Sequence, residues 1–207
     1  MNRKLTIPDI VVGRLPRYLQ ALQRLQKRSV QTTSSKELGE ILGISAAQIR
    51  KDLSQFGEFG KQGTGYSVPF LIDRLEDILK LKHDWAIALV GVGDLGHAII
   101  RYQGFSNRGF CVSMAFDNDP EKIGTSIGGL IVEDIQNMPA RIHEAQVKIA
   151  MLTVPAAVAQ QAAEDLVKAG VTAILNYAPL VLSLPKHVQV EYIDPIISLQ
   201  HMTYYLE

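Results

Sequence analysis

One short motif constrains the fold more than any other feature of the chain. It follows an apolar run from Trp85 to Val90 and reads VGVGDLG, with three glycines in the spacing G-x-G-x-x-G. A continuous apolar run is typical of a parallel strand that is buried on both faces. The residues after the last glycine, Leu95 to Tyr102, favour a helix. A strand, a glycine-rich turn and a helix in this order predict a dinucleotide-binding βαβ unit.

A second predicted strand agrees with that interpretation. The sequence CVSMAFD ends at Asp117, 21 residues after Gly96, where the dinucleotide fingerprint places an acidic residue. In such a unit the first glycine makes the tight turn, the second lets the backbone approach a pyrophosphate, and the third allows close packing of helix on strand. The candidate cofactor-binding residues of the turn are Gly91, Val92, Gly93, Asp94, Leu95 and Gly96.

Asp117 also predicts which dinucleotide binds. Its carboxylate can accept hydrogen bonds from the adenosine ribose, and its charge would repel a 2′-phosphate. The neighbouring Asn118 and Asp119 offer no cation that would reverse this preference. The sequence therefore favours NADH and NAD⁺ over the phosphorylated dinucleotides.

Strand-like and helix-like segments alternate through the rest of the chain. VKIAMLTVP (147–155) precedes a helical pattern, and VTAILNYAP (171–179) and VQVEYIDP (188–195) follow it. This alternation predicts a doubly wound parallel sheet. Ligands of such sheets bind at the carboxyl ends of the strands. That rule nominates the following residues to flank the nicotinamide: Thr153, Val154, Pro155, Asn176, Tyr177, Ala178 and Pro179.

Charge divides the chain into two parts. Residues 1–82 hold 14 Lys and Arg against 8 Asp and Glu, a balance of +6, and residues 83–207 hold 7 against 13, a balance of −6. Such a split suggests two parts with different partners, of which the basic one faces a polyanion such as nucleic acid.

The basic part has the pattern of a helix-turn-helix. Apolar residues recur at helical spacing from Leu15 to Leu25, and the sequence SSKELGEILG follows. In that sequence Ser34 and Glu37 form a capping box and Gly43 ends the helix. Ser45 can then cap a third helix, AAQIRKDLSQF. The second helix of a helix-turn-helix enters the major groove.

The third helix carries side chains suited to DNA. Gln can bridge an adenine edge, Arg a guanine edge, and Ser and Lys bind phosphate oxygens. The glycine-rich sequence that follows, FGEFGKQGTGYSV, predicts a two-stranded hairpin that would act as a wing. The candidate DNA-binding residues are Arg14, Arg17, Ser34, Ser35, Ser45, Ala47, Gln48, Arg50, Lys51, Ser54 and Lys61.

Catalysis and metal binding are not indicated. The five histidines are scattered, with no metal-ligand spacing and no carboxylate partner implied, and no general base can be named. The single cysteine, Cys111, falls in a strand that is expected to be buried. No apolar run approaches the ~18 residues of a membrane span, and no signal peptide precedes the first helix. We therefore expect a cytoplasmic protein that is not an enzyme, with no metal and no membrane partner.

These motifs together resemble the Rex family of bacterial redox-sensing transcriptional repressors. The resemblance covers nearly the whole chain and rests on RLPRYLQAL, the helix-turn-helix with its glycine-rich wing, VGVGDLG, MAFDNDPEKIG, LTVPAAVAQ and ILNYAP. It implies an α/β protein with an N-terminal winged helix-turn-helix domain (residues 1–83), a Rossmann domain (84–193) and a C-terminal helix (194–207) that swaps between subunits.

The resemblance also implies a mechanism. A homodimer would bind pseudo-palindromic operator DNA, NADH would release it, and NAD⁺ would compete weakly. Tyr102 and Phe105 resemble residues that couple the nicotinamide pocket to the partner subunit, and Asp194 resembles a switch aspartate. Gln20 stands where some relatives carry an arginine able to pair with that aspartate, and Arg17 or Arg24 would have to substitute.

Three other functions remain open from the residues. One is an NAD-dependent oxidoreductase with an accessory basic domain, which would need a positioned general base. The second is a coenzyme A-binding protein with the same fold. The third is a structural DNA-binding protein in which the Rossmann part only dimerises.

Overall fold

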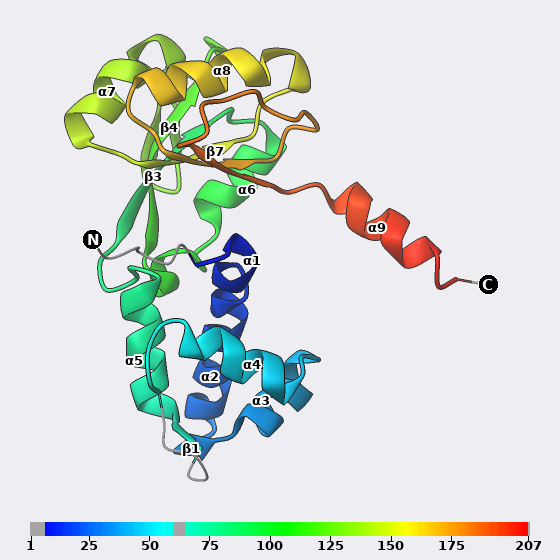
Figure 1. The fold of residues 1–207 in the computed structure, drawn as a ribbon. Coiled ribbons are helices and arrows are strands. Elements are labelled where there is room, and N and C mark those ends of the chain that lie inside the picture. The colour runs from blue at the N-terminus through cyan, green and yellow to red at the C-terminus, as the bar shows by residue number, and fades with distance from the viewer. Residues whose placement is uncertain (1–6, 60–64, 207) are drawn as a thin grey trace, which may run out of the picture. The chain divides into compact units, whose positions relative to one another are not determined.

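The structure is a computed structural model that describes residues 7–59 and 65–206. The chain divides into two compact units, Met1–His83 (unit 1) and Asp84–Glu207 (unit 2). Figure 1 shows the two units along the chain, from blue at the N-terminus to red at the C-terminus.

Unit 1 is built mainly from helices around a single core. Its large fully buried side chains include Tyr18 and Leu22 on one helix and Leu71 and Leu75 on another, and Ile49 packs into the same cluster. The elements are α1 (Asp9–Val12), α2 (Leu15–Lys27), β1 (Thr32–Thr33), α3 (Ser35–Leu42), α4 (Ala46–Ser54), β2 (Tyr66–Ser67) and α5 (Val68–Ile78).

The turn between α3 and α4 forms as the sequence predicts. Ser34 and Glu37 make a complete capping box at the start of α3. Gly43 ends that helix with φ +67°, a left-handed conformation that glycine adopts without steric cost. The side chain of Ser45 accepts a hydrogen bond from the backbone of Gln48 and caps α4. The helix-turn-helix is therefore confirmed.

The wing differs from the predicted two-stranded hairpin. Within the described part of this segment only Tyr66–Ser67 is a strand, and it pairs antiparallel with β1. Phe59 is buried in the core of unit 1 and is not in a strand. The sequence prediction missed β1 because two threonines give no alternating pattern. Lys61, the predicted wing contact, lies outside the described residues.

Unit 2 is a doubly wound α/β unit. Its sheet has the order β5-β6-β4-β3-β7-β8-β9, in which only β5 is antiparallel to its neighbour. The strands are β3 (Trp85–Val90), β4 (Phe110–Asp117), β5 (Ser126–Ile127), β6 (Leu130–Asp134), β7 (Ile149–Leu152), β8 (Ala173–Asn176) and β9 (Gln189–Tyr192). The hairpin of β5 and β6 was not predicted.

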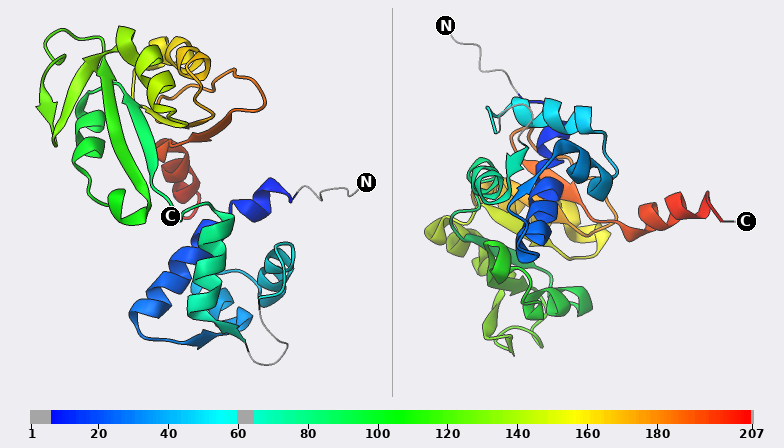
Figure 2. Two further views of the ribbon diagram at one scale, coloured as in Figure 1. Left: turned by 90° about the vertical axis from the view of Figure 1, so that its left-hand side faces the viewer. Right: turned by 90° about the horizontal axis from the view of Figure 1, so that it is seen from below.

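Helices cover both faces of this sheet (Figures 1 and 2). The side chains of α7 (Met138–Ala145) and α8 (Ala156–Lys168) pack into one core, and those of α6 (Asp94–Arg101) pack into another. Short 3₁₀ turns lie at Ser106–Arg108 and Ile135–Asn137. The order of the strands reverses between β3 and β7, which is the point where doubly wound sheets bind ligands.

The last helix of unit 2 differs from the others. The helix α9 (Pro195–Thr203) follows β9 and extends away from the sheet of its own unit (Figure 1). Its apolar side chains are exposed rather than packed: Ile196, Ile197, Leu199 and Met202. Across the part of the chain that is described, no helix is both long and apolar enough to cross a membrane.

Candidate nucleotide and nucleic-acid sites

The glycine-rich turn after β3 has the geometry that the spacing predicts. Gly91 has φ +96°, and a Cβ there would lie 2.7 Å from both the carbonyl oxygen of Thr153 and Cγ1 of Val154. A Cβ at Gly96 would overlap the carbonyl oxygen of Gly91. At Gly93, in contrast, an added Cβ meets nothing within 4 Å. The first and third glycines are required by packing, and the second leaves the turn open on its outer side.

The open side of the turn coincides with the start of α6. Gly93 is the N-cap of this helix, and no side chain caps it. The first N–H groups of a helix lack intrahelical partners and carry a partial positive charge, so they attract phosphate groups. Asp94 and Leu95 are both exposed in this first turn. The residues present fit a pyrophosphate at the turn.

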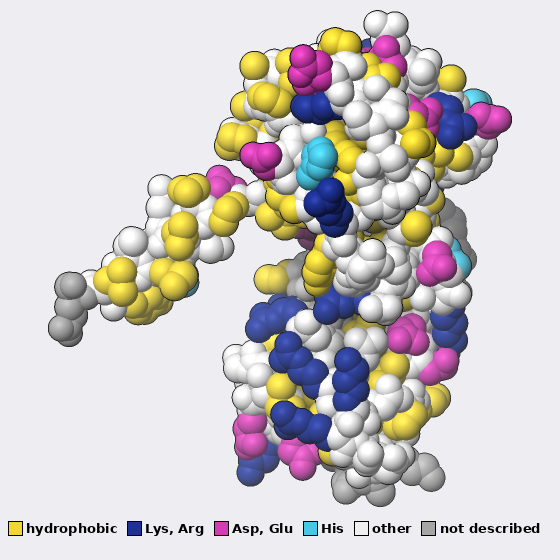
Figure 3. All heavy atoms as spheres, turned by 180° about the vertical axis from the view of Figure 1, so that it is seen from behind, with side chains coloured by type: hydrophobic (Ala, Val, Ile, Leu, Met, Phe, Trp, Pro, Cys, Tyr) yellow, Lys and Arg dark blue, Asp and Glu magenta, His cyan; other side chains and the backbone are white. Residues whose placement is uncertain are grey.

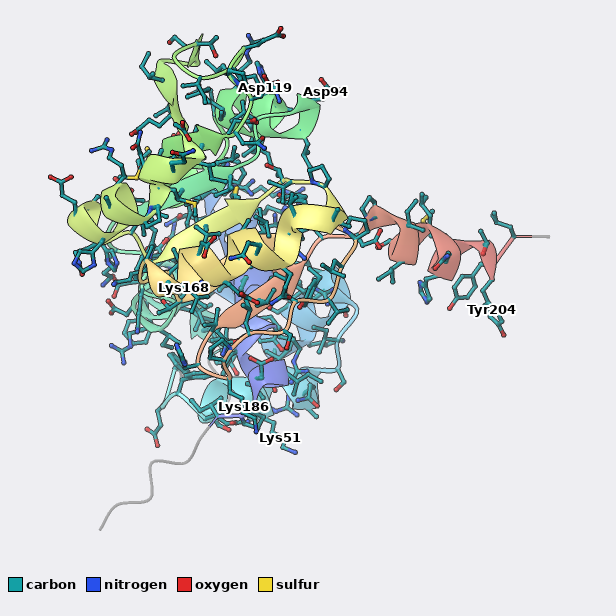
Figure 4. All side chains as sticks on the ribbon, turned by 90° about the horizontal axis from the view of Figure 1, so that it is seen from above. Lys51, Asp94, Asp119, Lys168, Lys186 and Tyr204 are labelled. Atoms are coloured by element: carbon teal, nitrogen blue, oxygen red, sulfur yellow. The ribbon has the colours of Figure 1, made fainter. Side chains whose placement is uncertain are left out.

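Asp117 fixes the position of the turn. It lies at the carboxyl end of β4, is only 6% exposed, and accepts a hydrogen bond of 2.7 Å from the backbone N–H of Val92. Burial opposes its ionisation, but hydrogen bonds from the backbone of Asp119 and of Val92 and the nearby Lys122 hold its pKa below the usual range. Asp117 is thus an ionised acceptor beside the glycine turn, as ribose binding requires. Figure 4 shows Asp94 and Asp119 at the same edge of unit 2.

The carboxyl end of β7 packs directly against the turn. The hydroxyl of Thr153 donates to the carbonyl oxygen of Gly91 over 2.6 Å and lies 3.1 Å from that of Val90. Val154 is half-buried, and Pro155 stands directly before the first residue of α8. Thr153 therefore holds two strand ends together, and its hydroxyl proton is already committed to the backbone.

The carboxyl end of β8 forms a self-contained loop. Asn176 is 1% exposed. Its amide nitrogen donates to the carbonyls of Ala178 and Leu180, and its amide oxygen accepts a hydrogen bond from the backbone N–H of Ala178. Its side chain therefore shapes the loop. Tyr177 is half-buried, and burial raises the pKa of its phenol. Pro179 is exposed.

Of the predicted coupling residues of unit 2, Tyr102 is exposed, whereas Phe105 and Asp194 are half-buried. Tyr102 ends α6, is 56% exposed, and its ring meets that of Phe105 edge-on with centroids 5.2 Å apart. Asp194 caps α9 by accepting a hydrogen bond of 2.9 Å from the backbone of Ile196. The carboxylate of Asp194 therefore orients the exposed helix.

In unit 1 the outer face of α4 carries exposed, DNA-compatible side chains. Ala47, Lys51 and Ser54 are exposed, and Figure 4 shows Lys51 extending outward from unit 1. Figure 3 shows Lys and Arg side chains gathered on one face of unit 1. Arg50 is exposed and donates to the hydroxyl of Ser35 over 3.0 Å, which links α4 to the start of α3.

Two of the predicted DNA-binding side chains point inward instead. Arg14 donates to both carboxylate oxygens of the fully buried Asp52, at 2.6 and 2.8 Å. Gln48 donates to the same carboxylate over 2.7 Å. Arg17 is exposed and donates to the carbonyl of Leu42 at the end of α3. Asp52 was missed because its importance depends on Arg14, which is 38 residues away.

Cys111 is exposed at the start of β4, so the prediction that it is buried is wrong. The side chains at the start of β4 alternate between half-buried and exposed, and Cys111 falls on the exposed side. Among the described residues, no group of three or more His, Cys, Asp or Glu side chains is arranged to hold a metal ion.

A capped helix-turn-helix and a nucleotide fold with an open glycine turn define, on one chain, a nucleotide-responsive DNA-binding regulator. Residues 82–180 match the family described as "CoA binding domain", and residues 6–54 match "Putative DNA-binding protein N-terminus". The chain is 52% identical over 206 residues to the redox-sensing transcriptional repressor Rex of Chloroflexus aurantiacus, covering 100% of this chain and 97% of that relative. It is 42% identical to Rex of Brevibacillus brevis, with 97% of each covered. The chain belongs to the Rex family of redox-sensing transcriptional repressors.

Solved structures of a Rex-family repressor, RSP, share the whole fold. The complex of RSP with β-NAD⁺ and operator DNA superposes with a TM-score of 0.92 at 38% identity, over 98% of this chain and 94% of RSP. The complex with β-NADH gives 0.88 at 35% identity, over 99% and 95%. These relatives confirm the fold class, the family and the expectation that the chain is a regulator and not an enzyme.

Proposed function

We propose that this chain represses transcription by binding operator DNA through unit 1, and that NADH bound to unit 2 weakens that binding. One observation carries the proposal: Asp117 holds an open, uncapped glycine turn on the same chain as a fully capped helix-turn-helix. The relatives that bind NAD⁺, NADH and operator DNA have the same fold over nearly the whole chain and support the assignment.

The DNA interface is proposed to centre on α4. Ala47, Lys51 and Ser54 would face the major groove and its phosphates, with Ser34, Ser35 and Ser45 at helix starts where backbone N–H groups also favour phosphate. Arg50 would contact DNA while its hydrogen bond to the hydroxyl of Ser35 holds its side chain in place. Arg14 and Gln48 would act indirectly, because both already bind Asp52.

The dinucleotide is proposed to lie along the carboxyl ends of β3, β4, β7 and β8. Gly91 to Gly96 would hold the pyrophosphate and Asp117 the ribose, and the nicotinamide would lie by Thr153 to Pro155 and Tyr177 to Pro179. The ring is positively charged in NAD⁺ and neutral in NADH. A close-fitting apolar surface around the ring therefore favours the reduced form.

A homodimer is the proposed active form. The exposed apolar side chains of α9 need a partner surface, because monomeric proteins rarely expose a contiguous patch of this kind. A second copy would supply that surface by exchange of α9, and a dimer would match a pseudo-palindromic operator. Tyr102, Phe105 and Asp194 are proposed to carry the signal between the nucleotide and the dimer, with Arg17 or Arg24 taking the place of the arginine that Gln20 lacks.

A titration of NADH with and without operator DNA tests the coupling. For NADH to weaken DNA affinity a hundredfold, it must favour the non-binding state by about 2.7 kcal/mol, and DNA must then weaken NADH binding by the same factor. A gel shift across NADH/NAD⁺ ratios should show release as the ratio rises. Equal NADH affinities with and without operator would exclude the proposal.

Coenzyme A is the second candidate ligand, because the family that matches residues 82–180 is described by it. The carboxylate of Asp117 beside the turn disfavours a ligand whose adenosine ribose carries a phosphate. Native mass spectrometry of the purified protein distinguishes the two, since the bound mass is either that of a dinucleotide or that of coenzyme A.

A further inference from the structure

The structure places a cation beside Asp117 that its immediate sequence neighbours do not provide. Nζ of Lys122 lies 3.3 Å from Oδ2 of Asp117 and 3.5 Å from Oδ2 of Asp119. The turn after β4 brings it there, because the backbone N–H of Lys122 bonds the carbonyl of Asp119 over 3.0 Å. From Asn118 and Asp119 alone, the sequence predicts an anionic site with no cation beside Asp117.

The net charge of the group formed by Asp117, Asp119 and Lys122 is small. Two carboxylates and one ammonium leave a net charge of about −1 close to the glycine turn. Asp117 is nearly buried, so its interactions are screened less than those of surface charges. Without the charge of Asp117, this group of side chains would be close to neutral, and Lys122 would contact a single carboxylate, that of Asp119.

Lys122 also has the freedom to reach a ligand. Its side chain is 35% exposed and that of Asp117 only 7%. The side chain of Asp117 is fixed by two backbone N–H groups, those of Val92 and Asp119, whereas the side chain of Lys122 bonds through its ammonium group at the end of a flexible stem. A lysine ammonium is a compact point charge on a mobile stem and a common phosphate ligand.

We propose that Lys122 is a selectivity-determining residue of the dinucleotide site: it is the cation that would bind a ribose 2′-phosphate, and the carboxylate charges beside it, chiefly that of Asp117, keep it from doing so. The ligand class is a 2′-phosphorylated dinucleotide such as NADPH. The inference rests on the proposed function, because it requires the adenosine ribose to lie beside Asp117.

Four versions of the full chain test it: the unmodified chain, Asp117→Asn, Lys122→Gln and the double variant. NADH and NADPH affinities are measured for each by calorimetry or by nucleotide fluorescence. We expect Asp117→Asn to bind NADPH at least tenfold more tightly than the unmodified chain does. The double variant should lose that gain, because the cation is then absent. Lys168→Gln, which breaks the exposed pair with Asp165, is the matched control and should change neither affinity.

A second variant keeps the test decisive if Asp117→Asn disturbs the turn. Asp119→Asn removes the other carboxylate that contacts Lys122 and leaves Asp117 in place, so it should tighten NADPH binding about threefold with NADH binding retained. The proposal is overturned if neither variant tightens NADPH binding, or if the gain survives in the double variant. An unmodified chain that folds but does not bind NADH would contradict the proposed function as well, and the two failures are thereby distinguished.

Discussion

Arg14 and Asp52 form a two-point ion pair that joins the start of α2 to the last turn of α4. Nε and Nη2 of Arg14 lie 2.6 and 2.8 Å from the two carboxylate oxygens, and Asp52 is completely buried. Tyr18 donates its hydroxyl to the same carboxylate over 2.6 Å, and Gln48 donates its amide over 2.7 Å. Since a carboxylate only accepts hydrogen bonds, it fixes which end of the Gln48 amide faces inward.

Replacing Asp52 with Asn should destabilise unit 1 by about 3 kcal/mol, because removal of one partner leaves the other charge buried without compensation. Asn has nearly the shape of Asp, so a cavity does not explain the loss. The measurement is hydrogen exchange of the α2 and α4 amides under increasing urea. Asp165→Asn, in the exposed pair with Lys168, is the control and should cost at most about 1 kcal/mol. Equal effects of the two substitutions would show that the buried pair contributes no more than a surface pair.

Unit 1 should also lose stability in acid through Asp52. Burial opposes the ionisation of Asp52, but hydrogen bonds from Arg14, Tyr18 and Gln48 outweigh it and lower its pKa. A carboxyl group with a lowered folded-state pKa stabilises fully above the unfolded value of about 4, and that contribution disappears as the pH falls through the folded value. Urea midpoints measured from pH 7 to pH 3 should fall more steeply below about pH 4 for the unmodified chain than for Asp52→Asn. Parallel curves would contradict the assignment.

Gly93 and Gly96 should respond differently to alanine. A methyl group at Gly93 meets no protein atom within 4 Å and its φ is −84°, so the variant should fold normally. It should bind NADH at least tenfold more weakly, because the methyl group stands where the pyrophosphate approaches. At Gly96 the methyl group overlaps the carbonyl of Gly91, so that variant should lose thermal stability. Normal NADH affinity in Gly93→Ala would place the pyrophosphate elsewhere.

The sequence predicted those parts of the molecule whose causes are local. The glycine spacing requires close approaches within a few residues, and the caps at Ser34 and Ser45 act on the next turn of chain. The doubly wound parallel sheet follows from the alternation of helix and strand patterns. The fold class and the glycine turn were therefore predictable.

The parts that the prediction missed depend on contacts between distant residues or on very short elements. Asp52 looks like an ordinary polar helix residue until the fold brings Arg14 to it. Lys122 becomes a partner of Asp117 only through the turn after β4. The hairpin of β5 and β6 begins with a strand of two residues, which is too short to show a periodic pattern.

Lys51 should contribute to DNA affinity without base specificity. It is exposed on the outer face of α4, and a lysine that contacts a phosphate releases about one counterion. In Lys51→Ala the affinity should fall on every DNA sequence, and the slope of log affinity against log salt should decrease by about 1. Fluorescence anisotropy at several KCl concentrations measures both quantities. Lys186→Ala, at an exposed site of unit 2, is the control and should leave the slope unchanged. An unchanged slope in Lys51→Ala would remove this residue from the interface.

Leu199 should be required for dimer formation and not for folding. Its side chain is 54% exposed on α9, where Ile197 and Met202 are also exposed, so a charge at this position costs the isolated chain little. In a dimer that buries α9, Leu199→Asp would place an unpaired carboxylate in an apolar interface. The variant should sediment as a monomer with an unchanged far-ultraviolet circular dichroism spectrum, and its affinity for a two-site operator should fall at least tenfold. Gln200→Asp adds the same charge at a polar position of the same helix and should weaken the dimer less. If Leu199→Asp sediments as a dimer, the partner surface of α9 is not the contact that joins the subunits.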